Sequence, residues 1–471
     1  MDTNPKPINR RRLLKGSLAA AAVVPFGGAL AACASSGSGS DNKDNHTATT
    51  TANPFGLKST SPIDAVIFNG GYGYDYVTFA GKQLNKKFAN VKLGIHPTTT
   101  ISQQLQPRFV GGNPPDLIDN SGASQIGFNS ILSQLETLDD VFEANNYEGT
   151  KISDTIYPNV KDPGTFGGKF VAVNYAMTVY AIWYSGALFE QYSWQPPKTW
   201  DDVLDLGAKA KAKGKYLWVW GVEAATYYQT LAMDSAIKEG GDEVNVALGN
   251  LEPNSWSHPA IQKVFAALET CVKKGYFIPG GAGTQFTKAQ AKWSLNEQAV
   301  LYPSGGWIEN EMKKATKDGF KMMGAPEPTV TSSSKMPYEA IRSAAGEPYI
   351  VPSQGKNTAG GKELLRAMLS KDAATNFSKT RLAPTIVKGL IPTDAFGSTA
   401  LASQSKMLEA AGSNTFDYEY FSLYGTNTDQ LTVWNSFLSG KIDASGLTKG
   451  LQQISDKVRK DPNVKKIKVT H

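Results

Sequence analysis

The strongest indication of the fold lies in residues 65–119, which read AVIFNGGYGYDYVTFAGKQLNKKFANVKLGIHPTTTISQQLQPRFVGGNPPDLID. Short apolar runs alternate in it with amphipathic segments, which predicts strands at 65–68, 91–95 and 116–119 and helices at 75–88 and 101–110. Such alternation predicts a parallel sheet in an α/β domain. Because ligands of these sheets bind at the carboxyl ends of the strands, we expect the loops at 69–74 and 119–122 on the binding side.

The α/β pattern continues through the rest of the chain. Residues 169–185 (KFVAVNYAMTVYAIWYS) form a run that is too long for one strand of this fold, and we expect it to cross between two lobes. Thr199 is the expected N-cap of the next helix. Cys271 lies in a helical apolar pattern, which predicts a buried small hydrophobe. A second α/β block extends to about residue 322, and further helices are expected at 364–377, 429–438 and 446–458.

The N-terminus reads as a targeting segment. A twin-arginine run at residues 10–15 precedes a small apolar stretch that is too short for a comfortable membrane span and ends in Leu30-Ala31-Ala32-Cys33. This ending resembles the lipobox of bacterial lipoproteins. We therefore expect a twin-arginine lipoprotein signal peptide at residues 1–32, lipid on Cys33, and a flexible tether at 33–53. The alternative is an ordinary signal peptide with a chance cysteine.

Charge and cysteine content narrow the class of protein. The whole chain has a formal net charge of +6, but residues 1–32 carry five Lys/Arg and one Asp, so the mature chain is close to +2. The basic balance therefore belongs to the signal peptide and does not indicate nucleic-acid binding. With Cys33 used by lipid, Cys271 has no intramolecular disulfide partner.

Motifs of common enzymes and metal sites are absent from the sequence. It holds no H-E-x-x-H and no G-x-S-x-G, and residues 355–362 lack the lysine of a phosphate loop. We therefore predict no catalytic residue, no metal site and no cofactor. A carboxylate pair for glycoside hydrolysis stays open as an alternative, because Asp and Glu are plentiful.

Three motifs, in order along the chain, are similar to those of the extracellular solute-binding proteins of sugar ABC transporters. They are GNPPD at 112–116, YAIWYSGALFEQYSWQPPKTWDD at 180–202, and NEQAV at 296–300 followed by Gly305-Gly306-Trp307. Gly186 replaces the family's usual lysine, and Asn296 and Glu297 replace its Gly-Lys. A closer resemblance, to the N-acetylglucosamine/diacetylchitobiose-binding subgroup, is carried by NPFG at 53–56, LQPRFVGGNPPD at 105–116, NYA at 174–176, PYEAIR at 337–342 and AGEP at 345–348.

The resemblance implies an α/β, two-lobed periplasmic-binding-protein-like fold of the maltose-binding-protein-like class II, with a ligand cleft between the lobes. Lobe one is expected to comprise residues 54–176 plus about 323–380, and lobe two 177–322 plus about 381–471. The chain should cross between them near 176–181, near 322–326 and after Phe377. Closure of such lobes follows a hinge mechanism.

A pyranose has apolar C–H faces and a rim of hydroxyls, so aromatic rings and amide or charged groups suit it. Trp307 follows two glycines, although a core tryptophan is the rival interpretation. Trp218 alternates with Trp220 in a strand-like run, which favours core packing for both. One of Tyr227 and Tyr228 should point to the cleft, and the cluster FDYEYF at 416–421 could line it too. The expected ligand-binding residues are Asn69, Tyr72, Asp119, Asn120, Asn174, Tyr175, Trp218, Tyr227, Tyr228, Trp307, Arg342 and Glu347.

Together these features predict a monomeric receptor outside the cytoplasm, anchored to the cell membrane by lipid alone. It would bind N-acetylglucosamine, chitobiose or a short chito-oligosaccharide and deliver the sugar to the permease subunits of an ABC importer. Two alternatives stay open, a binding protein for a different sugar or solute and a tethered glycan-active enzyme.

Overall fold

The computed structural model describes residues 47–157, 160–418 and 420–470. The expected signal peptide, Cys33 and the tether up to residue 46 lie outside these ranges. Residues 47–53 of the expected tether are held to the body, because Thr47 N donates to Gly56 O at 2.6 Å and Arg366 donates to Ala52 O at 3.2 Å. The tether prediction is therefore wrong for these last residues. Of the helices that these ranges contain, none has the length and apolarity to cross a membrane.

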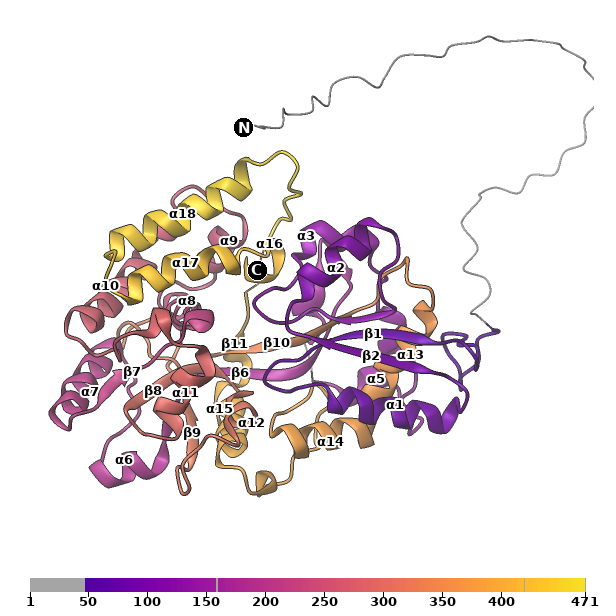
Figure 1. Ribbon diagram of the computed structural model, residues 1–471, viewed down its shortest axis with the longest axis horizontal. Coiled ribbons are helices and arrows are strands. Elements are labelled where there is room, and N and C mark those ends of the chain that lie inside the picture. The colour runs from indigo at the N-terminus through magenta and orange to yellow at the C-terminus, as the bar shows by residue number, and fades with distance from the viewer. Residues whose placement is uncertain (1–46, 158–159, 419, 471) are drawn as a thin grey trace, which may run out of the picture. The chain divides into compact units, whose positions relative to one another are not determined.

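One mixed sheet of nine strands runs through the described chain (Figure 1). Seven strands follow the order β2-β1-β3-β10-β6-β8-β7, while β11 pairs with β10 and β9 pairs with β6. The strands are β1 (Ile63–Phe68), β2 (Leu93–Thr98), β3 (Leu117–Asp119), β6 (Val173–Ser185), β7 (Tyr216–Trp218), β8 (Ala299–Gly305), β9 (Met322–Ala325), β10 (Ile341–Ile350) and β11 (Thr415–Phe416), beside a separate hairpin of β4 (Thr165–Phe166) and β5 (Lys169–Phe170).

Helices cover the sheet. They are α1 (Asp75–Lys87), α2 (Ile101–Val110), α3 (Phe128–Ile131), α4 (Asp139–Glu143), α5 (Ile152–Thr155), α6 (Gly186–Tyr192), α7 (Trp200–Ala212), α8 (Tyr227–Gly240), α9 (Asp242–Gly249), α10 (Pro259–Lys273), α11 (Phe286–Ser294), α12 (Ile308–Met312), α13 (Thr358–Met368), α14 (Lys371–Arg381), α15 (Thr399–Ala411), α16 (Tyr420–Tyr424), α17 (Asn427–Leu438) and α18 (Ala444–Lys460).

The central part of β1 is buried on both faces, which explains its continuous apolar sequence, whereas the edge strand β2 is only partly buried. β1 pairs in parallel with β2 and with β3, as the alternation of elements predicts. Ala65 and Ile67 pack in the cluster that contains residues of α1 and α13, whereas Val66 points to the other face and packs with residues of α2. Side chains of a strand alternate between faces, so helices on both sides require apolar residues at every position.

Two core regions share the sheet. The first region is built mainly from residues 55–176 and 346–387, and the second from residues 177–345 and 398–458. Leu423, Ile467 and Val469 come from the end of the chain but pack in the first core. β6 belongs to both, because residues 173–179 pair with β10 whereas residues 180–185 pair with β8 and β9. Figure 1 shows β6 and β10 running between the two groups of helices. The long apolar run at 169–185 thus crosses between regions, as its length predicts.

Two expected crossings lie elsewhere. Residues 323–340 were expected in the first lobe, but β9 pairs with the second-region end of β6, and Ala325, Val330 and Met336 pack in the second core. The chain returns to the first region only within β10. Ala383, Ile386 and Val387 pack in the first core, so the crossing expected after Phe377 follows residue 387 instead.

Local signals in the sequence give accurate helix starts. Thr199 Oγ1 accepts from Asp202 N at 3.2 Å and Asp202 accepts from Thr199 N at 2.9 Å, which makes a capping box at the start of α7.

Cys271 is buried, as its helical apolar pattern predicts, and burial raises the pKa of its thiol to about 12. The single helix expected at 364–377 is wrong, because Ser370 leaves helical geometry and caps α14 through Ala373 N.

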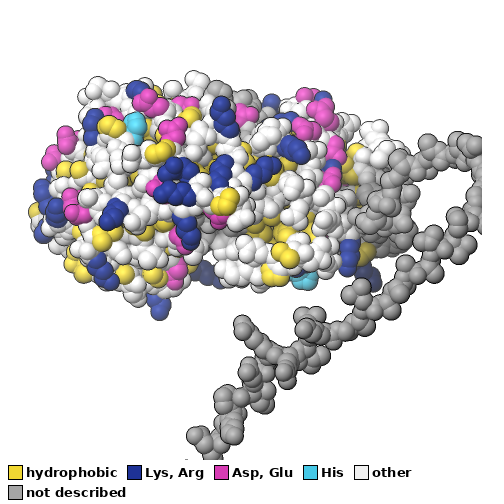
Figure 2. Space-filling view, turned by 90° about the horizontal axis from the view of Figure 1, so that it is seen from above, with side chains coloured by type: hydrophobic (Ala, Val, Ile, Leu, Met, Phe, Trp, Pro, Cys, Tyr) yellow, Lys and Arg dark blue, Asp and Glu magenta, His cyan; other side chains and the backbone are white. Residues whose placement is uncertain are grey.

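Surface side chains of either charge are mixed on the face seen in Figure 2, and hydrophobic ones are scattered. Within the described residues, the large hydrophobic side chains classed as exposed are Val110, which is 90% exposed, and Leu295, which is 46% exposed. Val110 ends α2 in the first region, and Leu295 follows α11 in the second.

Candidate ligand-binding site

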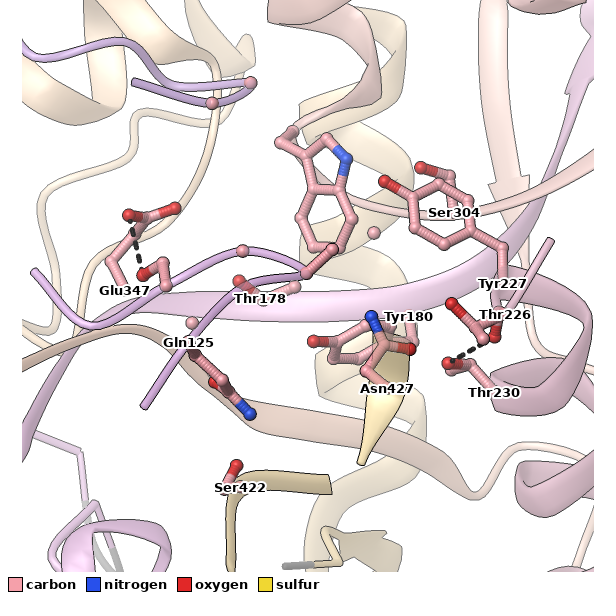
Figure 3. Close-up of a pocket in the computed structure, with 18 of the residues that line it drawn as sticks. Gln125, Thr178, Tyr180, Thr226, Tyr227, Thr230, Ser304, Glu347, Ser422 and Asn427 are labelled. Carbon is pink, nitrogen blue, oxygen red and sulfur yellow. Dashed lines mark hydrogen bonds between the residues drawn. The ribbon is translucent and has the colours of Figure 1, made fainter. Parts of the chain in front are cut away.

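A cavity of about 570 Å³ is lined by residues of both core regions. In the first region it lies at the carboxyl ends of β1 and β3, where residues 69–71 and 121–123 reach it. This is the edge that the strand alternation predicts. Figure 3 shows Glu347 on one side of the cavity and Tyr227, Thr226 and Ser304 on the opposite side. We call the two sets of lining residues the first wall and the second wall, after their core regions.

The second wall carries a cluster of aromatic rings. Trp307 packs edge-on against Tyr180, with ring centroids 5.7 Å apart, and against Tyr227 at 6.0 Å. Two glycines make room for the indole, since a Cβ on Gly305 would lie 2.0 Å from a ring carbon of Trp307 and a Cβ on Gly71 2.8 Å from another. The first glycine of the Gly-Gly-Trp motif therefore has a steric reason. The cluster offers ring surface of the kind that packs against apolar C–H groups.

A buried arginine lies between two more aromatic rings of this wall. The guanidinium of Arg342 lies 4.1 Å from the ring centre of Tyr180 and 4.0 Å from that of Tyr418. Its Nε donates to Asp417 Oδ1 at 2.8 Å. Stacking and ion pairing together stabilise a charge that is 7% exposed. Arg342 is thus a fixed cation in the cavity wall.

The first wall is built mainly from amides, small residues and phenylalanines. Asn69 follows β1, and Asn174 lies on β6. The amide nitrogen of Asn174 and the hydroxyl of Ser304, on the opposite wall, have no hydrogen-bond partner among the described residues. Both walls therefore hold polar groups whose hydrogen-bonding capacity is not used up within the protein.

Glu347 is the one ionisable side chain that the first wall presents among the described lining residues. Its φ of 57° is the left-handed conformation, which is strained for a non-glycine residue and marks functional positions. Ser121 donates to its Oε2 at 3.2 Å. Burial raises the pKa of Glu347, and burial together with the nearby Glu347 carboxylate raises the pKa of Asp119. The two carboxyls therefore resist simultaneous ionisation.

Glu311 is one of the carboxyls of the second wall, beside Glu223, Glu327 and Asp417. It lies on α12, one turn after Trp307, and accepts a hydrogen bond from Gln290 Nε2 at 2.7 Å. Burial raises its pKa to about 7, while the Gln290 bond acts in the opposite direction. Near neutral pH this group exists in both forms, so it can donate as well as accept a hydrogen bond.

Six of the twelve expected ligand-binding residues line the cavity: Asn69, Asn174, Tyr227, Trp307, Arg342 and Glu347. From the cluster at 416–421, Asp417 and Tyr418 line it as well, whereas Phe416 packs against the second core. The structure therefore brings residues from far-apart segments to one site.

Trp218 and Tyr228 are core residues, so their expected place in the cleft is wrong. Both are fully buried in the second region, with ring centroids 5.7 Å apart. Tyr228 donates its hydroxyl to Val219 O at 2.7 Å. Neighbouring residues of a helix point about 100° apart, so only one of Tyr227 and Tyr228 can face the cavity.

The other four expected residues lie behind the first wall. Tyr175 alternates with Asn174 on β6 and therefore points into the first core, where its ring stacks on Tyr76. Tyr72 packs edge-on against Phe377, with centroids 5.1 Å apart. Asp119 accepts from Ser121, and Asn120 braces the following loop through the backbone of Ile126. These residues support the wall and do not form it.

Several lining residues escaped the sequence analysis, although signals for two of them exist. Tyr180 lies on the same face of β6 as Asn174, because side chains repeat every second residue along a strand. Glu311 lies four residues after Trp307, one helical turn along α12. No comparable local signal marks Gln125, Thr226 or Asn427, which reach the cavity from loops and helix starts.

Comparison with known proteins gives the class of this chain. Residues 70–375 match the family of bacterial extracellular solute-binding proteins, and the chain belongs to this family. Among its relatives is the diacetylchitobiose binding protein NgcE of Streptomyces coelicolor, which is 61% identical over 465 residues, covering 98% of either chain.

Solved structures show the same fold at much lower sequence identity. A chitin oligosaccharide binding protein superposes with a TM-score of 0.69 at 15% identity, covering 85% of this chain and 99% of its own. RafE in complex with raffinose gives 0.66 at 18% identity, covering 84% of this chain and 99% of its own. The chain thus has the two-lobed α/β fold of sugar solute-binding proteins, as its motifs predict.

Proposed function

We propose that the chain is an extracytoplasmic receptor that binds diacetylchitobiose in the cavity between its two walls and delivers it to an ABC importer. The observation that carries the proposal is the cavity itself, where the rings of Tyr180, Tyr227 and Trp307 face amide and carboxyl groups of the first wall. The name of the Streptomyces coelicolor relative supplies the particular sugar.

The chemistry of the two walls suits an N-acetylated sugar. Aromatic rings cover the apolar faces of pyranoses, and amide and charged groups bond their hydroxyls. An acetamido group adds a methyl, which fits apolar surface, and a carbonyl, which requires a donor. The Asn174 amide, the Arg342 guanidinium and the protonated form of Glu311 are such donors.

A panel of ligands tests this function. Diacetylchitobiose and cellobiose have equal length and differ in their acetamido groups, so they form a matched pair for calorimetry and thermal unfolding. A ligand that binds only the folded protein at a hundredfold excess over Kd stabilises it by about 2.7 kcal/mol. We expect this shift with diacetylchitobiose and a smaller one with cellobiose. Equal shifts would contradict the preference for N-acetylated sugars, and a response to another solute alone would replace the ligand.

We further propose that the protein binds this sugar without hydrolysing it. The resemblance to a binding protein supports this reading, because the family is defined by solute binding. Purified protein incubated with chitobiose and chitotriose should leave both intact. Product that accumulates in proportion to protein concentration would favour the glycan-active enzyme instead.

The proposed anchor is lipid on Cys33. A monomer held in this way at the cell membrane keeps the receptor close to its permease. Cys33→Ala removes the thiol that lipid requires, so the protein should appear in the medium or remain uncleaved. Correctly processed Cys33→Ala protein that stays on the membrane at the wild-type level would contradict the anchor.

A further inference from the structure

The end of α16 packs against α3, and two glycines touch within this contact. Leu423 of α16 lies in the same apolar cluster as Phe128 of α3. Gly127 immediately precedes α3 in the first region, and Gly425 immediately follows α16 in the second. A Cβ on Gly127 would lie 3.0 Å from the carbonyl carbon of Tyr424 and 3.1 Å from Gly425 N. A Cβ on Gly425 would lie 3.3 Å from Gly127 N. The two backbones therefore touch where neither has a side chain.

The first-region side of this contact is firmly held. Asn120 donates its side-chain amide to Ile126 O at 2.9 Å and accepts from Ile126 N at 2.8 Å. Phe128 is buried and stacks on Phe166, with ring centroids 4.1 Å apart. Gly127 lies between these two fixed residues, so it cannot move away without disturbing them.

The second-region side is held as well. Tyr420 is fully buried, and its hydroxyl lies 2.9 Å from Ser455 Oγ and accepts from Gln430 at 2.9 Å. Gly425 has a φ of 61°, the left-handed conformation that favours glycine. Leu423 of the same helix is buried in the first core, so α16 is bound to both regions. A side chain at position 127 would therefore push the end of α16, and the second region with it, away from α3.

The contact lies at the edge of the cavity. Gln125 and Phe128 flank Gly127, Ser422 and Asn427 flank Gly425, and all four residues line the cavity. Figure 3 shows Gln125 and Ser422 on the same side of it. The separation of α3 and α16 at this point therefore contributes to the distance between the two walls, beside the hydrogen bond from Asn310 to Gly71 O.

We propose that Gly127 and Gly425 are positioning residues, whose side-chain-free contact allows the walls to approach closely enough to hold the ligand. Two-lobed binding proteins close by hinge motion, and the linking strands here are β6 and β10. A methyl group at position 127 would keep the two walls further apart and so oppose their closure on the ligand, although it would not contact the ligand itself. The choice of ligand in the test rests on the proposed function, whereas the steric relation does not.

Gly127→Ala tests whether a methyl group at position 127 opposes closure of the walls, and Gly283→Ala is the matched control. Gly127 has φ −62° and ψ 129°, which alanine adopts without strain, and its close contact with Asn129 Oδ1 is relieved by side-chain rotation. Gly283 also lies outside the left-handed region, and a Cβ there would meet no atom within 4 Å. In the full chain we expect Gly127→Ala to lower the affinity for diacetylchitobiose at least tenfold, mainly through faster dissociation. The control's affinity and thermal midpoint should stay at wild-type values, and Gly127→Ala should still unfold in one cooperative transition without ligand, which shows that its fold is kept.

A distance measurement separates this proposal from the proposed function. Double electron–electron resonance between spin labels at Val110→Cys and Leu295→Cys measures the separation of the two regions. Cys33 and Cys271 are replaced by serine in this protein. With saturating ligand, Gly127→Ala should keep a longer separation than the wild type. If the wild type binds no chito-oligosaccharide, the proposed function is wrong. The role of the two glycines is then tested by the distances measured without ligand, which should be longer in Gly127→Ala than in the wild type. Wild-type distances in Gly127→Ala, or wild-type affinity, would overturn it.

Discussion

The two walls of the cavity are built from different chemistry. The aromatic residues of the first wall are phenylalanines, Phe68, Phe128 and Phe166, and its polar groups are mainly amides and hydroxyls. The second wall presents Tyr180, Tyr227, Tyr418 and Trp307, together with the ion pair of Arg342 and Asp417. Rings with a polar edge and a paired charge can stack on a ligand and bond it from the same side.

The two walls should therefore contribute differently to ligand binding. The second wall combines ring surface and charge in a network whose members support one another, so it should supply most of the binding energy. The first wall adds hydrogen bonds and closes over the ligand. Variants in the second wall should therefore have larger effects than variants in the first, and the following predictions test that order.

Removal of the Arg342 guanidinium should have the largest effect. Arg342→Ala leaves the partly buried Asp417 without its cation and Tyr180 and Tyr418 without the group between them. We expect a loss of unfolding free energy on the order of 3 kcal/mol, together with weaker ligand binding. Chemical denaturation and calorimetry measure both. Arg342→Lys keeps the positive charge and should lose less unfolding free energy and less affinity than Arg342→Ala. Equal losses in both variants would show that the guanidinium group is required, and not only its charge.

Trp307→Ala should weaken ligand binding by about 1–3 kcal/mol, because it removes the ring that joins Tyr180 and Tyr227. Calorimetry at a fixed temperature measures the change. Trp307→Phe keeps a ring and should retain part of the affinity. If Trp307→Ala bound as tightly as the wild type, the aromatic cluster would be core packing and the contrast between the walls would disappear.

Glu311 should make stability depend on pH. Its folded-state pKa of about 7 lies above the ordinary value of 4.5, so between these pH values the folded protein binds more protons than the unfolded chain. Its contribution to the free energy of unfolding is therefore present below about pH 4.5 and is lost as the pH rises to about 7, by ~3 kcal/mol at most. Glu311→Gln should remove this part of the pH dependence in denaturation curves. Glu252→Gln, at an exposed position outside the cavity, is the control and should reproduce the wild-type curve.

Asn174→Ala should have the smallest effect, about 1 kcal/mol of binding free energy, because it removes one amide from the first wall. Stability should change little, since the amide nitrogen has no partner among the described residues. Calorimetry again provides the measurement. A loss larger than that of Trp307→Ala would reverse the proposed order of the walls.

The sequence was informative wherever short-range physics decides. The alternation of apolar runs predicts the parallel strands β1, β2 and β3 and the edge at which the cavity lies. The capping box at Thr199 and the helices near the end of the chain follow from neighbours within one helical turn. The return of the chain to the first region within β10 was missed, because β9 and β10 pair with distant segments of β6.

The candidate site likewise depends in part on contacts between segments that are far apart in the sequence. The fold class, the crossing strand and the pair of tyrosines that supplies a lining residue, Tyr227 and Tyr228, follow from local sequence patterns. Which of the two tyrosines faces the cavity depends on the elements that pack on each side of α8, and local sequence does not specify these. In the folded chain Tyr227 lines the cavity, whereas Tyr228 donates to Val219 O. The contact of Gly127 with Gly425 likewise exists only after folding, because the space that a missing Cβ leaves is defined by an element from the other core region.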